Sequence, residues 1–575
     1  MTGVQSSDPF AAPGALHFVP LGGVGEIGMN TALLGCDGKW LMIDLGVAFA
    51  DETLPGIDLL TPDPAFIAER RADLVGLVLT HAHEDHLGAV AHIWPRLGCP
   101  VHATPFAAEI LRHKLAEFGL ADEVPVHVVT PGERLALDPF GVTYVGVTHS
   151  IPEPNALAIE TPAGLVVHSG DWKLDPDPQV GSPVDEAALR RLGKAGVLAL
   201  LCDSTNAHLP GSSGSEADLF EGLSALVADR SGRVAVTTFA SNVARIRTVA
   251  AVAAAHGRRL CIAGRSLWRT IEAARRCGHL DGTGAFLSER DVGYLPRREV
   301  LLLCTGCQGE PRGALARIAG DEHPHVSLEA GDRVIFSSKI IPGNERPLAR
   351  LHDRLVERGI DVITERTDLV HVSGHPARDD LRRLYGWLRP RIAVPVHGER
   401  IHLTAHARLA REMGVPEVLS ATNGDVLRLA PGPAARVGRV PAGRLAVDGD
   451  RLVPPDDEAL KARRRLMHNG AALVTLVADA AGGLIGDPRI ALHGLPLDGA
   501  AGDLERAIVA AIAESVAGLA PAAARRDEPL ANAARQGLRR AIRAACGKRP
   551  VTEVQVVRLS AEGGARPPTD GGTAT

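Results

Sequence analysis

The chain has 575 residues, which predicts about two to four domains, because a single hydrophobic core does not grow to that size. Its 45% apolar and 23% charged residues are typical of a soluble globular protein, and no apolar run reaches the length of a membrane span. The net charge of −6 argues against a uniformly basic nucleic-acid binder but leaves room for a local basic channel.

The N-terminus and the cysteines favour a cytoplasmic protein. Residues Met1–Pro13 are polar and lack the basic and apolar segments of a secretory signal. The eight cysteines are scattered at low density, which is typical of reduced thiols. We therefore expect a cytoplasmic location.

The first predicted elements are the strands of a β-meander, at Leu16–Leu21, Met29–Leu34 and Lys39–Ile43. Between the first two strands, Gly23, Gly25 and Gly28 match a dinucleotide-binding fingerprint. That fingerprint requires a helix to follow, whereas a strand, a turn and another strand follow here. The pattern therefore argues against a nucleotide site.

Asp44 closes the last of these strands. A carboxylate in this position is either a turn former or a partner that braces a metal ligand. Helices are predicted over 64–71, 87–97 and 106–118, with a buried apolar strand over 75–80.

The six residues after that buried strand are dense in potential metal ligands: His81, His83, Asp85 and His86. Neutral imidazole and carboxylate suit a borderline cation such as zinc, and there are too many ligands for a single tetrahedral site. The alternative is a polar loop that is merely rich in histidine. Glu84 lies within the cluster, but we assign it no ligand role.

Two later strands end in further candidates. The strand over 142–147 is followed by His149, and the strand over 164–167 is followed by Asp171. A lone histidine after a strand is more often structural, but the cluster at 81–86 favours a ligand role for both residues. A carboxylate that bridges two ions suits a two-metal site, in which the metals lie roughly 3.5–4 Å apart.

This set of residues resembles the metallo-β-lactamase hydrolase superfamily. The resemblance implies an αββα sandwich that holds one or two zinc ions between the edges of two sheets. A final histidine closes the site in that superfamily, and the next candidate here is His397. The distance from Asp171 (397 − 171 = 226 residues) leaves room for an inserted domain.

The intervening segment predicts a parallel α/β domain, since helices alternate with strands. Loops at the carboxyl ends of such strands are where ligands bind. The predicted helices are 216–229, 242–255 and 266–277, and the predicted strands are 233–238, 259–262 and 300–304.

Other stretches carry further polar candidates. The strand that begins at Leu200 ends in Asp203, and a helix is predicted over 346–358. The loop His371-Val372-Ser373-Gly374-His375 offers imidazoles, a hydroxyl and backbone N–H groups to an anion, although it is also readable as a helix-capping loop. Cys304 and Cys307 form a CxxC pair, but no second pair or nearby histidine supports a zinc site.

Asp203, His375 and His397 resemble the three motifs of the β-CASP branch of the superfamily, whose members process nucleic acids. Within that branch the ribonuclease J family matches best, in the same order over about 16–400. DNA-directed members generally lack the third-motif histidine, so His397 indicates RNA. Cys307 departs from the pattern, where a small polar residue is expected, but it is no ligand. The matching stretches are 81–86, 148–152, 168–171, 203–207, 239–242, 304–306, 308–311, 342–345, 371–375 and 397–399.

The resemblance implies two Zn²⁺ ions per subunit, with Mn²⁺ or Mg²⁺ as alternative metals in activity. The implied ligands are His81, His83 and His149 for one ion, Asp85, His86 and His397 for the other, and Asp171 as the bridge. The implied catalytic residues are Asp85, His375 as a general acid, and Asp203, which orients His375. Asp44 would brace the ligand loop. The implied substrate-binding residues are Ser241 and Asn242 on one wall and His371, Val372, Ser373, Gly374 and His375 on the other.

The expected architecture is α/β, with a metallo-β-lactamase sandwich, an inserted parallel β-CASP domain and a small α+β C-terminal domain. In that last domain, strands are predicted over 472–479, 488–492 and 551–559, and helices over 502–518 and 529–546. The expected bounds are 14–208 and 366–440 for the sandwich, 209–365 for the insertion, 441–455 for a linker, 456–560 for the C-terminal domain and 561–575 for a disordered tail.

The resemblance implies a 5′-to-3′ exoribonuclease for 5′-monophosphate RNA that also cuts internally, acting in mRNA decay and rRNA maturation. Its expected partners are single-stranded RNA, a second copy in a homodimer or homotetramer formed through the C-terminal and catalytic domains, and proteins of an RNA-degradation complex, with no membrane. The alternatives are an inactive or weakly active RNA-binding paralogue, a small-ester or thioester metallo-hydrolase and a DNA-repair nuclease.

Overall fold

The computed structural model describes residues 10, 12–228, 230–341, 343–496 and 501–559. The chain divides into two compact units. One comprises the residues up to Phe49 together with Leu59–Leu445, and the other comprises Ala50–Asp58 and the residues from Ala446 onward. Within the part of the chain that is described, no helix is both long and apolar enough to cross a membrane.

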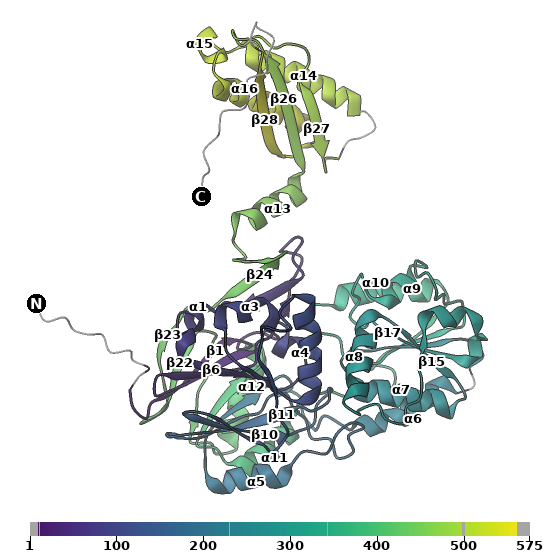
Figure 1. The fold of residues 1–575 in the computed structure, drawn as a ribbon. Helices are drawn as coiled ribbons and strands as arrows, with labels where there is room; N and C mark the ends of the chain where they lie inside the picture. The colour runs from purple at the N-terminus through teal and green to yellow at the C-terminus, as the bar shows by residue number, and fades with distance from the viewer. Residues whose placement is uncertain (1–9, 11, 229, 342, 497–500, 560–575) are drawn as a thin grey trace, which may run out of the picture. The chain divides into compact units, whose positions relative to one another are not determined.

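Two facing sheets form the heart of the first unit (Figure 1). The larger sheet has the order β23 (Ala435–Arg439), β22 (Asp425–Ala430), β1 (Leu16–Gly22), β2 (Thr31–Cys36), β3 (Lys39–Ile43), β6 (Leu74–Val78), β7 (Val101–Ala103) and β8 (Val126–Val128). The smaller sheet has the order β21 (Glu417–Val418), β20 (Ile392–Val396), β13 (Val197–Asp203), β12 (Gly164–His168), β11 (Asn155–Thr161), β10 (Phe140–Gly146) and β9 (Arg134–Leu137). The predicted meander is confirmed, because β1, β2 and β3 pair antiparallel in sequence.

The core between the two sheets explains why these strands are so apolar. Leu34 and Leu41 from the larger sheet meet Tyr144 and Leu201 from the smaller sheet in one buried cluster. A second cluster lies on the other face of the smaller sheet, where Leu189 and other helical residues cover it. A sheet buried on both faces needs near-continuous apolar strands, and the sequence of β13, VLALLCD, is of this kind.

Helices flank the sandwich on both sides, as the predicted αββα architecture requires. They are α1 (Ala65–Ala68), α2 (Glu84–Leu87), α3 (Val90–Leu97), α4 (Pro105–Glu117), α5 (Glu186–Ala195), α11 (Arg378–Leu388) and α12 (Arg400–Glu412), and a short hairpin is formed by β4 (Ala48–Phe49) and β5 (Leu59–Pro62). One prediction is wrong in detail. The helix expected over 87–97 begins at Val90 as α3, and Leu87 ends the separate short helix α2. The helical hydrogen bonds stop at Ala89, whose N–H donates to the Leu45 carbonyl, while the Asp85 carbonyl accepts from Asn30 N.

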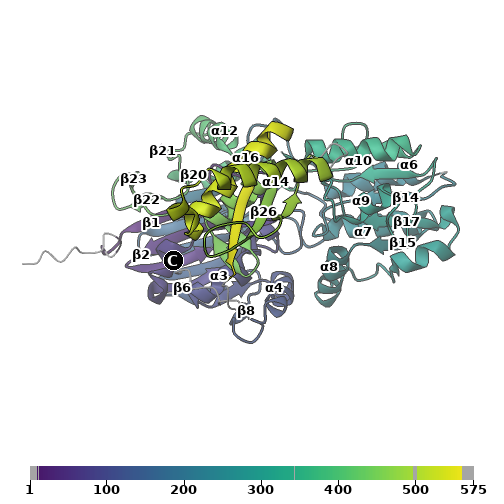
Figure 2. The ribbon, with the colours of Figure 1, turned by 90° about the horizontal axis from the view of Figure 1, so that it is seen from above.

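The predicted inserted parallel sheet is confirmed (Figure 2). Its order is β16 (Leu287–Ser288), β15 (Arg259–Ala263), β17 (Val300–Cys304), β14 (Val234–Thr237), β18 (Arg333–Phe336) and β19 (Asp361–Ile363), and the neighbouring strands pair parallel. Its helices are α6 (Leu219–Val227), α7 (Val243–Ala255), α8 (Arg265–Arg276), α9 (Ala314–Ala319) and α10 (Glu345–Glu357). The helix predicted over 216–229 begins as a 3₁₀ turn, Glu216–Asp218, because Ser215 and Asp218 form a capping box there.

The second unit is a small α+β domain, as predicted. Its sheet has the order β27 (Arg489–His493), β26 (Ala471–Ala478) and β28 (Val551–Arg558), and α14 (Ala501–Ala517) and α16 (Asp527–Cys546) cover one face (Figure 1). Ile508, Ile512 and Leu538 from these helices pack with Val474 and Leu476 from β26. The remaining elements along this part of the chain are β24 (Arg444–Asp448), β25 (Arg451–Val453), α13 (Glu458–Asn469) and α15 (Pro521–Ala524). The tail predicted to be disordered lies outside the described residues.

Candidate metal centre and active site

The candidate ligands follow strands of both sheets at one edge of the sandwich. The loop that begins at His81 follows β6, and His149 follows β10. Asp171, Asp203 and His397 stand at or just past the ends of β12, β13 and β20, which pair parallel. Because the carboxyl ends of parallel strands meet at one edge, residues far apart in sequence converge there.

The structure brings together all seven predicted metal ligands. They form overlapping groups whose ligand atoms lie within 4.8 Å of one another. The first group is His81, His83, His149 and Asp171, the second is Asp85, His86, Asp171 and His397, and the third is Asp171, Asp203, His375 and His397. Asp171 belongs to every group, so its carboxylate is shared by all three sets of potential ligands.

The first group is a set of neutral donors. His83 Nδ1 lies 3.1 Å from both His81 Nε2 and His149 Nε2, and Asp171 Oδ2 lies 3.8 Å and 3.7 Å from those two nitrogens. Burial lowers the pKa of all three histidines, that of His83 to about 4. Neutral imidazoles that point their nitrogens at one place fit a bound cation, since a metal ligand must be deprotonated.

The second group joins two carboxylates to two imidazoles. Asp171 lies 3.2 Å from His86 Nε2 and 2.7 Å from His397 Nδ1, and Asp85 lies 3.5 Å from His86 Nε2. Burial opposes a charge on His397, but Asp171 outweighs it and raises its pKa to about 9. Burial likewise opposes a charge on His86, and the three carboxylates around it raise its pKa. Because buried carboxylates are costly without a positive partner, the carboxylates of this group fit a bound divalent cation.

Asp44 lies behind the ligand loop, where the sequence predicted a brace. Its buried carboxylate accepts hydrogen bonds from Thr80 N and Thr80 Oγ1, both at 2.8 Å, and lies 2.7 Å from His86 Nδ1. Thr80 Oγ1 is also 2.9 Å from His81 Nδ1. The Asp44 carboxylate accepts a hydrogen bond from His86 Nδ1–H, which fixes the ring proton on that nitrogen. His86 Nε2 therefore presents its lone pair to the site, because the outer partner of an imidazole sets its tautomer.

Asn30 is a site residue that the sequence reasoning missed. Its Nδ2 lies 3.0 Å from Asp85 Oδ2 and 3.0 Å from His86 Nε2, and its backbone N–H donates to the Asp85 carbonyl. Nothing in the local sequence marks this residue, because the contact spans 55 positions. Gly46 completes the same support: a Cβ there would lie 1.7 Å from the Asp85 carbonyl oxygen, so the segment after β3 approaches the ligand loop as only glycine allows.

The half-buried His375 and the buried Asp203 form a pair beside the metal ligands. His375 Nδ1 lies 2.8 Å from Asp203 Oδ2, and Asp203 Oδ1 accepts hydrogen bonds from Thr205 N and Oγ1. Burial opposes a charge on His375, but Asp203 outweighs it and raises the pKa of the imidazole. The predicted orientation of His375 by Asp203 has this geometric support.

A buried polar chain backs the loop that carries Asp203. Ser204 Oγ lies 2.8 Å from His406 Nδ1, and Tyr385 OH lies 2.9 Å from His406 Nε2. The backbone N–H of Ser204 donates to the carbonyl of His397. Burial lowers the pKa of His406 to about 4, so the ring is neutral and its two nitrogens hold one donor and one acceptor.

The predicted anion-binding loop has mixed support. Among the described residues His371 Nδ1 is buried without a hydrogen-bond partner, and its pKa is lowered by burial and by the nearby cations Arg245, Lys339 and Lys173. Arg245 and Lys173 are held in buried ion pairs with Glu216 and Asp175, so Lys339 is the cation of the three that suits a phosphate.

Ser373 Oγ, by contrast, already accepts hydrogen bonds from Asn206 Nδ2 and from the backbone of His375. Gly374 turns its carbonyl to His149 Nδ1, at 2.5 Å, and Val372 is buried. This loop therefore also supports a metal ligand.

The predicted opposite wall lies at the start of α7. Asn242 is buried, and its side chain accepts a hydrogen bond from Arg245 N, so it is the N-cap of α7. A capping amide has one acceptor fewer for a substrate. Ser241 is half-buried at the same turn.

Four protein-family models match the chain. Their descriptions are "Beta-lactamase superfamily domain" at residues 52–200, "Ribonuclease J, beta-CASP domain" at 231–355, "Zn-dependent metallo-hydrolase RNA specificity domain" at 350–419 and "Ribonuclease J C-terminal domain" at 458–559.

Curated relatives match along most of the chain. Ribonuclease J of Sinorhizobium meliloti is 45% identical over 550 residues, which cover 95% of this chain and 97% of the relative. Ribonuclease J of Synechocystis sp. is 36% identical, over 84% of this chain and 76% of the relative. Ribonuclease J of Mycobacterium tuberculosis strain H37Rv is 39% identical, over 81% of this chain and 83% of the relative.

A solved structure also resembles the fold. The crystal structure of a protein of unknown function from Enterococcus faecalis V583 matches with a TM-score of 0.50 and 15% identity, over 72% of this chain and all of that chain. At this level of identity the likeness concerns the fold alone.

Proposed function

The chain belongs to the ribonuclease J family, and from this premise we propose that it is a metal-dependent ribonuclease with two ions held around Asp171. The observation that carries the proposal is the convergence of seven ligands into two groups that share this carboxylate. A shared carboxylate is what a two-metal phosphodiesterase needs, since both ions must act on one phosphate.

The ions we propose are Zn²⁺, with Mn²⁺ or Mg²⁺ as alternatives in activity. The donor set supports zinc, because imidazoles outnumber carboxylates in it. His81, His83 and His149 would hold one ion, and Asp85, His86 and His397 the other. Bound divalent cations supply the charge that activates a water and neutralises the phosphoryl oxygens.

The chain's own residues would place the substrate and move the proton. With His375 Nδ1 held by Asp203 at 2.8 Å, the Nε2 edge is free to give a proton to the leaving oxygen. The raised pKa of His375 keeps that proton on the ring near neutral pH. Asp44 and Asn30 would hold the ligand loop in register, and Asp85 acts as a ligand rather than as a base.

We propose single-stranded RNA with a 5′-monophosphate as the substrate, cut mainly from the 5′ end and also internally. The support is the Lys339 ammonium near His371, where a terminal or backbone phosphate would lie, with Ser241 on the opposite wall. Val372, Ser373 and Gly374 would shape the phosphate loop, and Asn242 would act through the turn that it caps. The processes that such an activity serves are mRNA decay and rRNA maturation.

The wider organisation is part of the same proposal. We keep the domain bounds expected from the sequence, with the sandwich at 14–208 and 366–440 and the insertion at 209–365. The second unit would join subunits into a dimer or tetramer, together with the catalytic domains, and proteins of an RNA-degradation complex are further partners. The eight unpaired cysteines support a cytoplasmic location.

The test is product analysis on matched oligonucleotides. The full-length protein should release 5′-nucleotides from 5′-monophosphate RNA faster than from 5′-triphosphate RNA, and much faster than from DNA of the same sequence. Asp85→Asn should abolish release, whereas Asp122→Asn, an exposed change remote from the ligands, should not. Equal cleavage of RNA and DNA, or an unaffected Asp85→Asn variant, would refute the proposal.

A further inference from the structure

A cavity of about 380 Å³ lies in the inserted domain, within the size range of small-molecule sites, about 300–1,000 Å³. It is formed by residues that follow β17, β18 and β19 and by the first turns of α10. The carboxyl edge of a parallel sheet is where such folds bind ligands. None of the lining residues belongs to the metal-ligand groups or to the phosphate loop.

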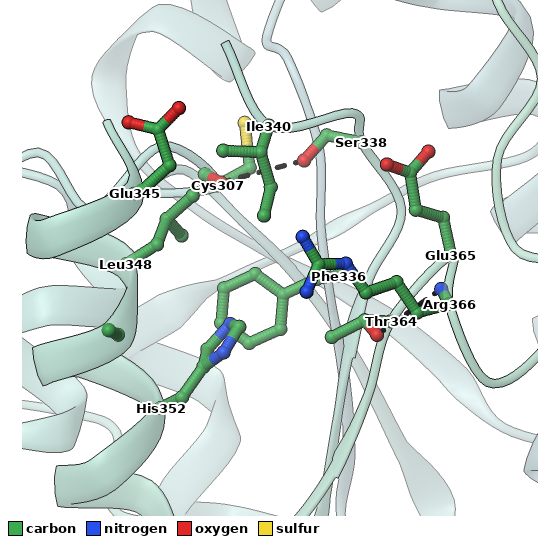
Figure 3. Close-up of a pocket in the computed structure, with 11 residues that line it drawn as sticks. Cys307, Phe336, Ser338, Ile340, Glu345, Leu348, His352, Thr364, Glu365 and Arg366 are labelled. Atoms are coloured by element: carbon green, nitrogen blue, oxygen red, sulfur yellow. Dashed lines mark hydrogen bonds between the residues drawn. The ribbon is translucent and has the colours of Figure 1, made fainter. Parts of the chain in front are cut away.

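One side of the cavity is apolar and aromatic (Figure 3). Phe336 and Leu348 line it, and the His352 ring stands edge-on to Phe336, with ring centroids 4.4 Å apart and an interplanar angle of 71°. Burial lowers the pKa of His352, so this ring is neutral near pH 7. Phe336 is 3% exposed, so the half-buried His352 and Ile340 offer the uncharged surface for the flat face of a planar ligand.

The other side carries two charged side chains, Arg366 and Glu365, with Ser338 beside them (Figure 3). Within the described residues, the Arg366 guanidinium forms no ion pair within 4.0 Å, and the Glu365 carboxylate accepts no hydrogen bond from the protein. Burial raises the pKa of Glu365, while Lys339 and Arg366 act against it. Both residues are exposed, so the five donors of Arg366 and the two acceptor oxygens of Glu365 are open to a ligand at the cavity.

We propose that this cavity binds a guanine base, carried either by the RNA chain or by a free guanine nucleotide. Guanine alone among the common bases has two adjacent N–H donors, N1–H and N2–H, which match a carboxylate, and two acceptors, O6 and N7, which match a guanidinium. Adenine has no such donor pair, and it would leave one oxygen of Glu365 unpaired. The face of the base would lie against the half-buried His352 and Ile340. The inference does not rest on RNA cleavage, because binding is measured directly.

The first experiment is hydrogen–deuterium exchange of the full-length protein with guanosine, adenosine and 5′-GMP. Guanosine lacks the phosphate that the His371 loop would hold, so its binding reports on the base alone. The expected result is slower exchange at 336–352 and 364–366 with guanosine and 5′-GMP, and no change with adenosine. Protection that is absent from these segments, or equal for guanosine and adenosine, overturns the proposal.

Substitutions of the two exposed residues Arg366 and Glu365 test whether they bind the base. Arg366→Gln and Glu365→Gln should each weaken guanosine binding by about tenfold, as expected for loss of one bidentate contact. Arg354→Gln and Glu357→Gln, exposed on α10 but outside the lining, are matched controls and should bind as the wild type does. If Arg366→Gln and Glu365→Gln bind guanosine as tightly as these controls do, the proposal is overturned.

The last experiment distinguishes the two sources of the base. RNA with one internal 6-thioguanine should crosslink on irradiation to the peptide that contains Phe336 and His352 if the base comes from the chain. In that case Arg366→Gln should also raise the KM for guanine-containing RNA several-fold, with no effect on guanine-free RNA. Guanosine protection without a crosslink assigns the cavity to a free nucleotide. If there is no protection by guanosine and no crosslink, both forms of the proposal are overturned.

Discussion

Replacing Asp44 by asparagine tests how the protein holds the second metal group. The change keeps size and shape, and the left-handed backbone of this residue (φ 58°) is tolerated by both Asp and Asn. The amide oxygen still accepts from Thr80 N. The amide nitrogen, however, replaces the oxygen that lies 2.7 Å from His86 Nδ1.

An N–H group in that position requires His86 Nδ1 to be an acceptor. The ring proton then moves to Nε2, the nitrogen that faces Asp85 and Asp171 at 3.5 and 3.2 Å. A protonated Nε2 cannot bind a metal. Loss of an outer partner of this kind typically costs about 10- to 100-fold in metal affinity, or about 1.4–2.8 kcal/mol.

The assay is competition between the full-length protein and a chromophoric zinc chelator. The variant should keep one tight site per subunit and weaken the other by this amount, with RNA cleavage reduced in parallel. Asp37→Asn is a matched control, because Asp37 is also a left-handed aspartate (φ 50°) but lies exposed, where it accepts from Gly14 N. An Asp44→Asn variant that binds both ions as tightly as the wild type does would refute the tautomer argument.

Asp203→Asn and His375→Gln should each lower kcat for RNA cleavage about 10²–10⁴-fold while the metal content stays at the wild-type level; loss of metal in either variant would contradict the proton-transfer role. Tyr385→Phe leaves the buried His406 Nε2 without its hydrogen-bond partner and should lower the free energy of unfolding of the catalytic unit by about 1–3 kcal/mol, measured by urea denaturation. An unchanged urea midpoint would argue against this buried hydrogen bond. The folded protein holds the pKa of His406 at about 4, against an ordinary 6.5, so protons bind the unfolded chain first as the pH falls from 6.5 to 4. The free energy of unfolding of the wild type should therefore fall over that window by up to about 3 kcal/mol more than that of His406→Gln, as measured by urea denaturation at pH 7 and 4.5. Equal losses in the two proteins would refute the low pKa of His406.

The features that the sequence predicted well carry a strong local signal. The strand before His81 is a short apolar run, and the inserted helices and strands alternate with clear periods, so their existence and type follow from pattern. Six of the ligands were expected together because they follow predicted strands, where a sheet gathers side chains, and the seventh, His397, was expected from the resemblance to the superfamily.

The features that were missed depend on contacts across the fold. Asn30 touches Asp85 only because the segment after β1 passes the ligand loop, and no periodicity encodes that approach. The break between α2 and α3 follows from the hydrogen bond of Ala89 N–H to the Leu45 carbonyl, which lies far away in the sequence. The N-cap role of Asn242 was not predicted either, although its position before a helix gives its side chain a near backbone donor.

The most direct test is to strip the full-length protein of metal and titrate it with Zn²⁺ while following RNA cleavage on the same sample. The wild type should bind two ions per subunit and recover cleavage as the second ion binds. Asp171→Asn should lose both tight binding and cleavage, whereas Asp177→Asn, an exposed neighbour, should behave as the wild type does. Cleavage by the stripped protein, or two tight ions and normal cleavage in Asp171→Asn, would contradict a two-metal centre bridged by this carboxylate.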